Sequence, residues 1–259
     1  MIPTLSKIRI YPIKSLDPVE LTSVKIGMRS LSGDRRYAML NQYGSFINGK
    51  ATGLVSQLQT TFDETLEYVT FKKRGSDDKA IFNLNSETDQ IESYLSNFFS
   101  TKVSLIKNEE GRLMDIPDES AATVIAYETL QHLADTLTDS IDTLRLRFRA
   151  NLEFSNVEPY WEERLANYDS ENRVAFRVGD VNMIGISLRA RCNVPPRNPF
   201  TGETDKTFIK RMIESREHNI PSWSHIEKLG SLYHLSVDTF IPDSEIGKEI
   251  KVGDSLQLI

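Results

Sequence analysis

The feature that most constrains the fold of this 259-residue chain is hydrophobic alternation with a period of two. Successive side chains of a strand point to opposite faces of a sheet, so this alternation is typical of strands with one buried face. Strands that are short and closely spaced favour a barrel or a sandwich. In the first half of the chain the pattern predicts strands at residues 5–13, 21–28, 36–40, 66–72 and 103–107.

Three segments have helical periodicity instead. Apolar side chains recur at i, i+3, i+4 and i+7 over residues 91–98, and Ser86 and Asp89 precede them in the order of a capping box. Further helices are predicted at 127–137 and 206–216. With so many strands and few helices, we expect a mainly β (α+β) fold with a few flanking helices.

A polar stretch from residue 107 to 119 separates two series of strands, and we place a domain boundary there. The predicted domains are residues 1–113 and 114–259. Gly179 and Asp180 form a two-residue loop of hairpin type in the second series. That series has predicted strands at residues 122–126, 143–155, 173–178, 181–191, 231–237 and 251–258.

The charge balance argues against whole-protein binding to nucleic acid or to an anionic membrane. There are 31 basic and 37 acidic residues, which gives a formal net charge of −6. A local basic site can still attract an anion, because global charge does not determine local chemistry. No apolar run approaches the ~18 residues that a membrane span requires, so we expect no membrane partner and a cytoplasmic location.

Cys192 is the only cysteine, which excludes an internal disulfide framework, a four-cysteine zinc site and a self-contained iron–sulfur cluster. Two interpretations remain open for it. Cys192 continues the series of alternate apolar positions in the preceding predicted strand, which predicts a small buried thiol at the strand end. The neighbouring Arg189, Arg191 and Arg197 instead favour a thiolate, which can act as a nucleophile or a soft-metal ligand. A stiff, proline-rich loop over residues 193–203 follows.

The predicted strand at residues 143–155 has one apolar face and one basic face. Arg145, Arg147 and Arg149 alternate along the basic face, followed by Asn151. One interpretation is a solvated face that pairs with carboxylates of a neighbouring strand. The other is an anion site, because a guanidinium binds phosphate in a bidentate manner and stays charged when partly buried.

Other familiar sites lack support. The four histidines, at positions 132, 218, 225 and 234, are neither adjacent nor at i, i+4 spacing, so a histidine zinc site is poorly supported. The dinucleotide, P-loop and hydrolase fingerprints are absent from the sequence. Composition and spacing alone therefore predict a β-rich anion binder.

Five motifs in order resemble a known family. They are IYPIKS at residues 10–15, GDRRY at 33–37, RFRAN at 147–151, RCNVPPRNPFTGE at 191–203 and KVGD at 251–254. Together they resemble a MOSC protein with an N-terminal MOSC β-barrel domain. This family includes the mitochondrial amidoxime-reducing component, its bacterial relatives and the C-terminal part of molybdenum cofactor sulfurase. The resemblance implies an N-terminal β-barrel domain followed by a MOSC β-barrel domain.

The resemblance also implies a molybdenum cofactor, a molybdopterin whose dithiolene holds the metal. Cys192 matches the cysteine that ligates molybdenum, and Asp118 matches an acidic residue near the metal, so these two are the expected catalytic residues. At the family level, pyridoxal phosphate binding is a further possibility. The cofactor-binding residues carried over are Lys14, Ser15, Arg35, Arg149, Asn151 and Arg191.

The sequence departs from the family pattern after the cysteine. The family's Val-Pro-Thr-Arg-Asp-Pro reads Val-Pro-Pro-Arg-Asn-Pro at residues 194–199, which removes a hydroxyl and a carboxylate beside the ligand. Substrate preference is therefore expected to differ. One cysteine cannot hold an iron–sulfur cluster, so the resemblance implies electrons from a separate redox protein.

Three functions follow from these observations. The first is a molybdenum-dependent oxidoreductase that reduces small N-hydroxylated or N-oxide compounds, in which the cofactor supplies the chemistry. The second is a sulfur or molybdenum-cofactor carrier that uses a Cys192 persulfide or thiolate. The third is a module that binds an anion and turns nothing over.

Overall fold

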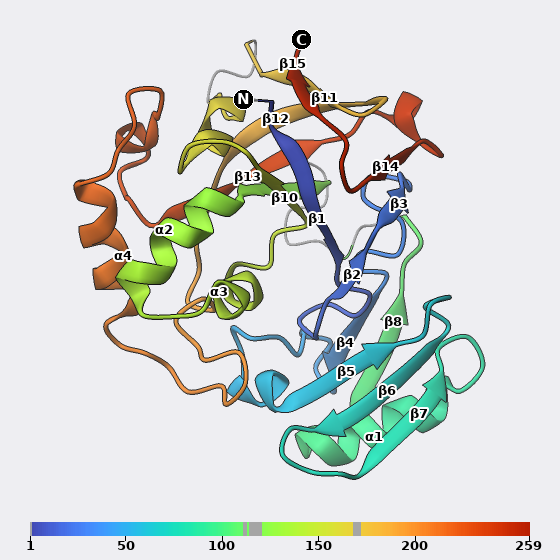
Figure 1. The fold of residues 1–259 in the computed structure, drawn as a ribbon. Coiled ribbons are helices and arrows are strands. Elements are labelled where there is room, and N and C mark those ends of the chain that lie inside the picture. Colours follow the sequence, from blue (N-terminus) through green and yellow to red (C-terminus); the bar gives the residue numbers. More distant parts are fainter. Residues whose placement is uncertain (1, 111–112, 114–120, 168–171) are drawn as a thin grey trace.

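A computed structural model describes residues 2–110, 113, 121–167 and 172–259 (Figure 1). The fold is mainly β, as predicted, and the described ranges contain four α-helices. Among the described helices, none combines the length and the apolarity that a membrane-spanning helix needs. Asp118 lies outside the described residues.

The largest element is an eight-stranded sheet that closes into a barrel. Neighbouring strands are antiparallel except for the parallel pair β9–β10. Thr4 bridges Ser255, and the Leu5 amide donates to the Asp254 carbonyl at 2.8 Å, which joins the first strand to the last. In sheet order the strands are β15 (Leu256–Leu258), β11 (Ala175–Val178), β12 (Val181–Ala190), β13 (His234–Phe240), β9 (Ala122–Ala126), β10 (Leu152–Ser155), β1 (Thr4–Ile10) and β2 (Val19–Leu21).

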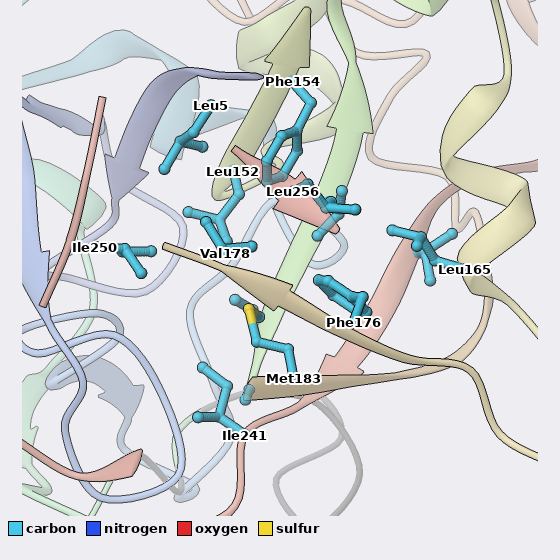
Figure 2. Packing of buried hydrophobic residues seen from close by; sticks show 14 of the residues in the cluster. Leu5, Leu152, Phe154, Leu165, Phe176, Val178, Met183, Ile241, Ile250 and Leu256 are labelled. Carbon is cyan, nitrogen blue, oxygen red and sulfur yellow. The ribbon is translucent and has the colours of Figure 1, made fainter. Parts of the chain in front are cut away.

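The barrel encloses an apolar core, part of which Figure 2 shows. Leu5 of β1 is fully buried there with Phe154 of β10 and Phe176 of β11. The start of the chain therefore completes a barrel built mostly from its second half. A further pair, β3 (Ser23–Lys25) with β14 (Glu249–Lys251), also joins the two ends of the sequence. Strand pairing thus crosses the boundary placed after residue 113, and the domain division itself stays a prediction.

The rest of the first half forms a smaller unit with its own core around Phe71, Ile91 and Leu95. One helix, α1 (Thr88–Phe99), packs beside its strands, as Figure 1 shows. A short 3-10 turn, η1 (Gly53–Gln57), leads into the meander. The strands are the pair β4 (Tyr37–Asn41) and β8 (Val103–Lys107), and the meander β5 (Leu58–Phe62), β6 (Tyr68–Lys73) and β7 (Lys79–Asn83).

Three helices form a third cluster against the barrel. They are α2 (Tyr127–Leu137), α3 (Ile141–Phe148) and α4 (Phe208–Glu217). Their buried side chains, including Leu133, Leu144 and Phe208, pack together. The helices predicted at 127–137 and 206–216 are confirmed, as is the two-residue turn between β11 and β12, where Val178 pairs with Val181.

The strand predicted at residues 143–155 is wrong. The Ser140 hydroxyl accepts a hydrogen bond from the Thr143 amide at 3.1 Å and caps α3, so this segment starts as a helix. Leu144 and Phe148 stand at i and i+4 on its buried face, a spacing that also satisfies a period of two. Arg149 ends the helix at φ 57°, and only the last four residues of the prediction form β10. Arg145, Arg147 and Arg149 therefore do not line one face of a strand.

Other expectations differ in detail. The predicted strand at 21–28 is divided between β2 and β3, and the one at 251–258 between β14 and β15. Strands β5 and β7 lie outside the predicted ranges, because neither LQTTF nor KAIFN alternates apolar and polar side chains regularly. The capping-box prediction is wrong, since Glu87 is the N-cap of α1 and makes no side-chain capping bond.

Candidate functional site

A cavity of about 450 Å³ lies where the smaller unit meets the barrel and α3. This volume is in the range of small-molecule and cofactor sites. Among the described residues, the acidic ones in the lining are Asp17 and Asp238. The basic ones are Lys14, Arg35, Lys50, Arg147, Arg149, Arg189, Arg191 and Arg197. The described part of the lining is thus strongly positive, in a chain whose net charge is −6.

The structure brings together most of the residues that the sequence singled out, although they come from distant parts of the chain. Asn151 is not part of the cavity lining, and Asp118 cannot be placed. The predicted residues that line the cavity are Lys14, Ser15, Arg35, Arg149, Arg191 and Cys192.

Three of these lining residues have unusual backbone geometry. Ser15, Arg35 and Arg149 adopt left-handed φ angles of 73°, 47° and 57°. Non-glycine residues adopt this region at an energetic cost, and such residues cluster at functional sites. For Arg149 this conformation is the left-handed C-cap of α3, the same one that Thr138 adopts after α2.

Arg149 lies partly buried beside another arginine. Its guanidinium stacks 4.0 Å from the centre of the Tyr11 ring, and the Arg35 guanidinium lies 4.5 Å from the same ring. Burial lowers the pKa of Arg149, and the positive charge of Arg35 lowers it further. Its Nη2 donates to the Leu16 carbonyl at 2.8 Å. A ligand with negative charge would relieve the repulsion between the two guanidinium groups.

Asn151 acts on the site through Arg35. Its side chain is 1% exposed, and its Oδ1 accepts a hydrogen bond from Arg35 Nη1 at 3.0 Å. The side-chain nitrogen of Asn151, Nδ2, donates to the Arg9 carbonyl at 2.9 Å. Asp34 forms an ion pair with Arg35 from another side. Asn151 is therefore a positioning residue in this structure.

Cys192 follows β12 and is only partly buried, so the prediction of a small buried thiol is wrong. The strand ends at Ala190, so the alternation of buried and exposed side chains that predicted a buried Cys192 does not continue into the loop. The Tyr233 hydroxyl donates to the Cys192 carbonyl at 3.2 Å and helps to fix the backbone there. The thiol-bearing residue thus faces the cavity from its barrel side.

Arg191, beside the cysteine, has an incomplete set of hydrogen bonds. Its Nη2 donates to the Phe148 carbonyl at 2.8 Å, but its buried Nε has no partner among the described residues. Burial lowers the pKa of Arg191 to about 10, and the positive charge of Arg189 adds to this effect. A buried donor without a partner is costly, so this group is suited to an acceptor supplied by a ligand.

Arg145 and Arg147 pair with carboxylates, but the solvated strand face of the first interpretation is wrong, because both residues lie on α3 and Arg147 is buried. Arg145 binds Glu153 with two hydrogen bonds of 2.6 and 2.7 Å and lies away from the cavity lining. Arg147 binds Asp139 at 2.7 Å. It also donates to the carbonyls of Pro195 and Arg197, both at 2.7 Å, and so holds the loop after Cys192. The sequence did not predict this second role.

The sequence also missed two polar residues on the barrel wall, Ser187 and Asp238. Ser187 and Arg189 of β12 line the cavity, and Arg189 forms an ion pair with Asp238 of β13. The sequence contained a signal for Ser187, because Ser187 and Arg189 occupy alternate positions on the polar face of the strand that leads to Cys192.

The described residues contain no group of three or more His, Cys, Asp or Glu side chains that could hold a metal. Within that part of the chain, a metal at this site would need ligands from a bound cofactor in addition to Cys192. The arrangement suits an anionic molecule that carries a soft metal.

Comparison with known proteins gives three findings. Residues 2–122 match the MOSC N-terminal beta barrel domain. Human molybdenum cofactor sulfurase is 21% identical in an alignment 286 residues long, which covers 92% of this chain and 31% of that protein. This chain therefore spans about a third of that relative. The crystal structure of the YuaD protein from Bacillus subtilis shares 12% identity over 99% of this chain and 94% of that one, with a TM-score of 0.40. The match to the MOSC N-terminal beta barrel domain thus covers the amino-terminal part of this chain.

Proposed function

We propose that this chain binds a molybdenum cofactor in the basic cavity and reduces N-hydroxylated or N-oxide compounds, with Cys192 as a molybdenum ligand. The observation that carries the proposal is that one cavity unites eight basic side chains with the chain's only cysteine. The family match over residues 2–122 and the name of the human relative support this class of cofactor.

The residues fit such a group. A pterin phosphate requires cationic donors that stay charged when partly buried, and Lys14, Arg35 and Arg149 meet at the cavity. Each charge-assisted hydrogen bond is expected to contribute about 1.5–3 kcal/mol. The Nε of Arg191, unpaired in the described part of the chain, provides one more donor. Lys14 is held for this role by its own bond to the Leu113 carbonyl at 2.9 Å.

Cys192 would complete the sulfur coordination of the metal, because a thiolate is a soft ligand. The bound cofactor supplies two-electron chemistry between molybdenum(IV) and molybdenum(VI). The protein's part is to hold the cofactor, to orient the thiol through the loop that Arg147 binds, and to position the substrate. Removal of a hydroxyl group from nitrogen breaks the N–O bond, takes up two electrons and two protons, and releases water.

These electrons must be supplied from outside the chain. One cysteine cannot hold an iron–sulfur cluster, and the sequence has no dinucleotide fingerprint. We therefore propose a separate redox protein as the donor. The cytoplasmic location and the absence of nucleic-acid and membrane partners stay predictions.

A second candidate is a sulfur or molybdenum-cofactor carrier. The name of the human relative, a sulfurase, favours it, and a partly exposed thiol at a cavity could hold a persulfide. Intact-mass analysis distinguishes the two, because a Cys192 persulfide in metal-free protein supports the carrier. Pyridoxal phosphate binding stays a prediction.

The test of the reductase is an anaerobic assay with a test amidoxime and reduced viologen as the electron source. The chain should form the amidine, and Cys192→Ala should not. Tyr43→Ala is a suitable control, because Tyr43 is 82% exposed and is not part of the cavity lining. Equal turnover by the parent chain and Cys192→Ala would refute the proposed role of the cysteine.

A further inference from the structure

The loop that follows Cys192 packs against the smaller unit along a continuous seam. We call residues 193–204 the cysteine loop and residues 48–57 the clasp segment. In Figure 1 the orange loop between β12 and α4 reaches the light-blue segment that precedes β5. The Gln57 side chain donates to the Thr201 carbonyl at 3.2 Å, and Arg74 stacks 5.4 Å from the Phe200 ring.

The seam is tightest at two glycines, where backbone meets backbone. A methyl group at Gly53 would lie 2.8 Å from the Gly202 carbonyl oxygen, and one at Gly202 would overlap the Gly53 carbonyl. Real Cβ atoms essentially never approach other atoms so closely. Gly49 adds a third close point, since a methyl group there would lie 3.2 Å from the Val194 side chain. The fit therefore requires small residues on both sides.

The same seam forms part of the cavity wall. Lys50, Val55 and Ser56 of the clasp segment line the cavity, as do Val194 and Arg197 of the cysteine loop. A change at the seam would therefore alter the wall beside Cys192.

Internal hydrogen bonds and prolines stiffen the cysteine loop. The Asn198 amide donates to the Glu203 carbonyl at 2.7 Å, and the Gly202 amide donates to the Asn198 carbonyl at 2.9 Å. Pro195, Pro196 and Pro199 restrict its backbone further. We therefore expect a displacement at Gly202 to shift the cysteine loop as far as Cys192.

We propose that Gly53 and Gly202 are positioning residues for Cys192. Their interlocked backbones hold the cysteine loop against the clasp segment, while Arg147 holds it from α3 through the Pro195 and Arg197 carbonyls. This arrangement sets the exposure of the thiol at the cavity. The inference deepens the proposed function and takes its significance from it, but the seam can be tested without the cofactor.

Because the chain has one cysteine, thiol labelling reports on Cys192 alone. The experiment uses the full chain from a host that cannot synthesise the molybdenum cofactor, and follows alkylation by iodoacetamide with intact-mass spectrometry. The variant is Gly202→Ala. Its matched control is Gly75→Ala, because Gly75 has φ 82° against 81° for Gly202 but has nothing within 4 Å of an added methyl group. Both substitutions impose the same backbone strain, and only one disturbs the seam.

Gly202→Ala should be alkylated about fivefold faster than the parent chain, because labelling follows the population in which the loop is released. Gly75→Ala should be alkylated at the parent rate. Gln57→Ala, which removes one hydrogen bond at the seam, should give a smaller increase and provides the test if Gly202→Ala does not fold. Equal rates in Gly202→Ala and Gly75→Ala, or an unchanged rate in Gln57→Ala when Gly202→Ala is unfolded, would overturn the proposal. A parent chain that carries no molybdenum when it is purified from a host that does make the cofactor would count against the proposed function and leave this labelling result intact.

Discussion

Arg147 and Arg149 are close neighbours in sequence, yet replacing each should have a different consequence. Arg147 is 6% exposed, and its ion pair with Asp139 and its bonds to two loop carbonyls are all 2.7 Å long. Removing one partner of a buried ion pair costs about 3–5 kcal/mol. The Asp139 side chain is 19% exposed and is partly solvated once its partner is removed, so we expect Arg147→Ala to cost about 3 kcal/mol.

Arg149→Ala should cost much less stability. Burial lowers the pKa of Arg149, which means that the fold disfavours its charged form when no anion is bound. The substitution removes the bond to the Leu16 carbonyl and the stacking on Tyr11, and the relief of repulsion from Arg35 offsets part of this cost. The net loss of stability should be at most about 1 kcal/mol. The same variant should nevertheless retain little cofactor.

Thermal unfolding of cofactor-free protein tests both values. A loss of 1 kcal/mol lowers Tm by about 2–4 °C in a chain of roughly this size, so Arg147→Ala should lower it by about 6–12 °C and Arg149→Ala by at most about 4 °C. Arg177→Ala is the control, because Arg177 is an exposed arginine on β11. Destabilisation by Arg149→Ala that equals or exceeds that of Arg147→Ala would refute the division into a structural and a ligand-binding arginine.

Three further predictions concern other parts of the molecule. Cys192→Ala should abolish reductase activity while the Tm of the cofactor-free chain stays within about 2 °C, because a partly exposed thiol buries little area; full activity would remove Cys192 from the mechanism. Burial and the neighbouring Glu163 raise the pKa of Glu162 to about 8, so the folded chain keeps a proton that the unfolded chain releases, and stability should fall as pH rises from about 5 through about 8. Glu162→Gln should flatten this profile and be the more stable chain near pH 9, and parallel Tm profiles for the two chains would contradict the shift. With NADH or NADPH alone the purified chain should not reduce an amidoxime, whereas a small redox protein should restore the reaction at a rate that falls as salt rises; turnover without that protein would require an internal electron-transfer site.

Local pattern predicted the fold best where one period dominates. The helix Tyr127–Leu137 has the predicted bounds, because its apolar positions fit a helical period only. The strand Ala122–Ala126 also has the predicted bounds, as a short apolar run whose five residues are all buried. Residues 143–155 fit two periods, since Leu144 and Phe148 are spaced for a strand face and for a helix face alike. The Ser140 cap decided between them, and it lies outside the alternating stretch.

Features that depend on contacts between distant segments could not be predicted in this way. No local pattern shows that Leu5 would bond to Asp254 and close the barrel, or that Gly53 would meet Gly202. For the site, ordered motifs identified residues that the fold gathers at one cavity, but not how each acts. That Asn151 supports Arg35 became visible only from the hydrogen bond between them.

The central claim is that the basic cavity holds a molybdenum cofactor, and the most direct measurement is the molybdenum and pterin content of freshly, anaerobically purified protein from a host that makes the cofactor. Metal analysis and fluorescence of the oxidised pterin should give about one of each per chain, since a single cavity holds the group. Arg149→Ala should give much less of both, and Arg177→Ala should match the parent chain. Parent protein without molybdenum and pterin, or equal content in Arg149→Ala and the parent, would contradict the account.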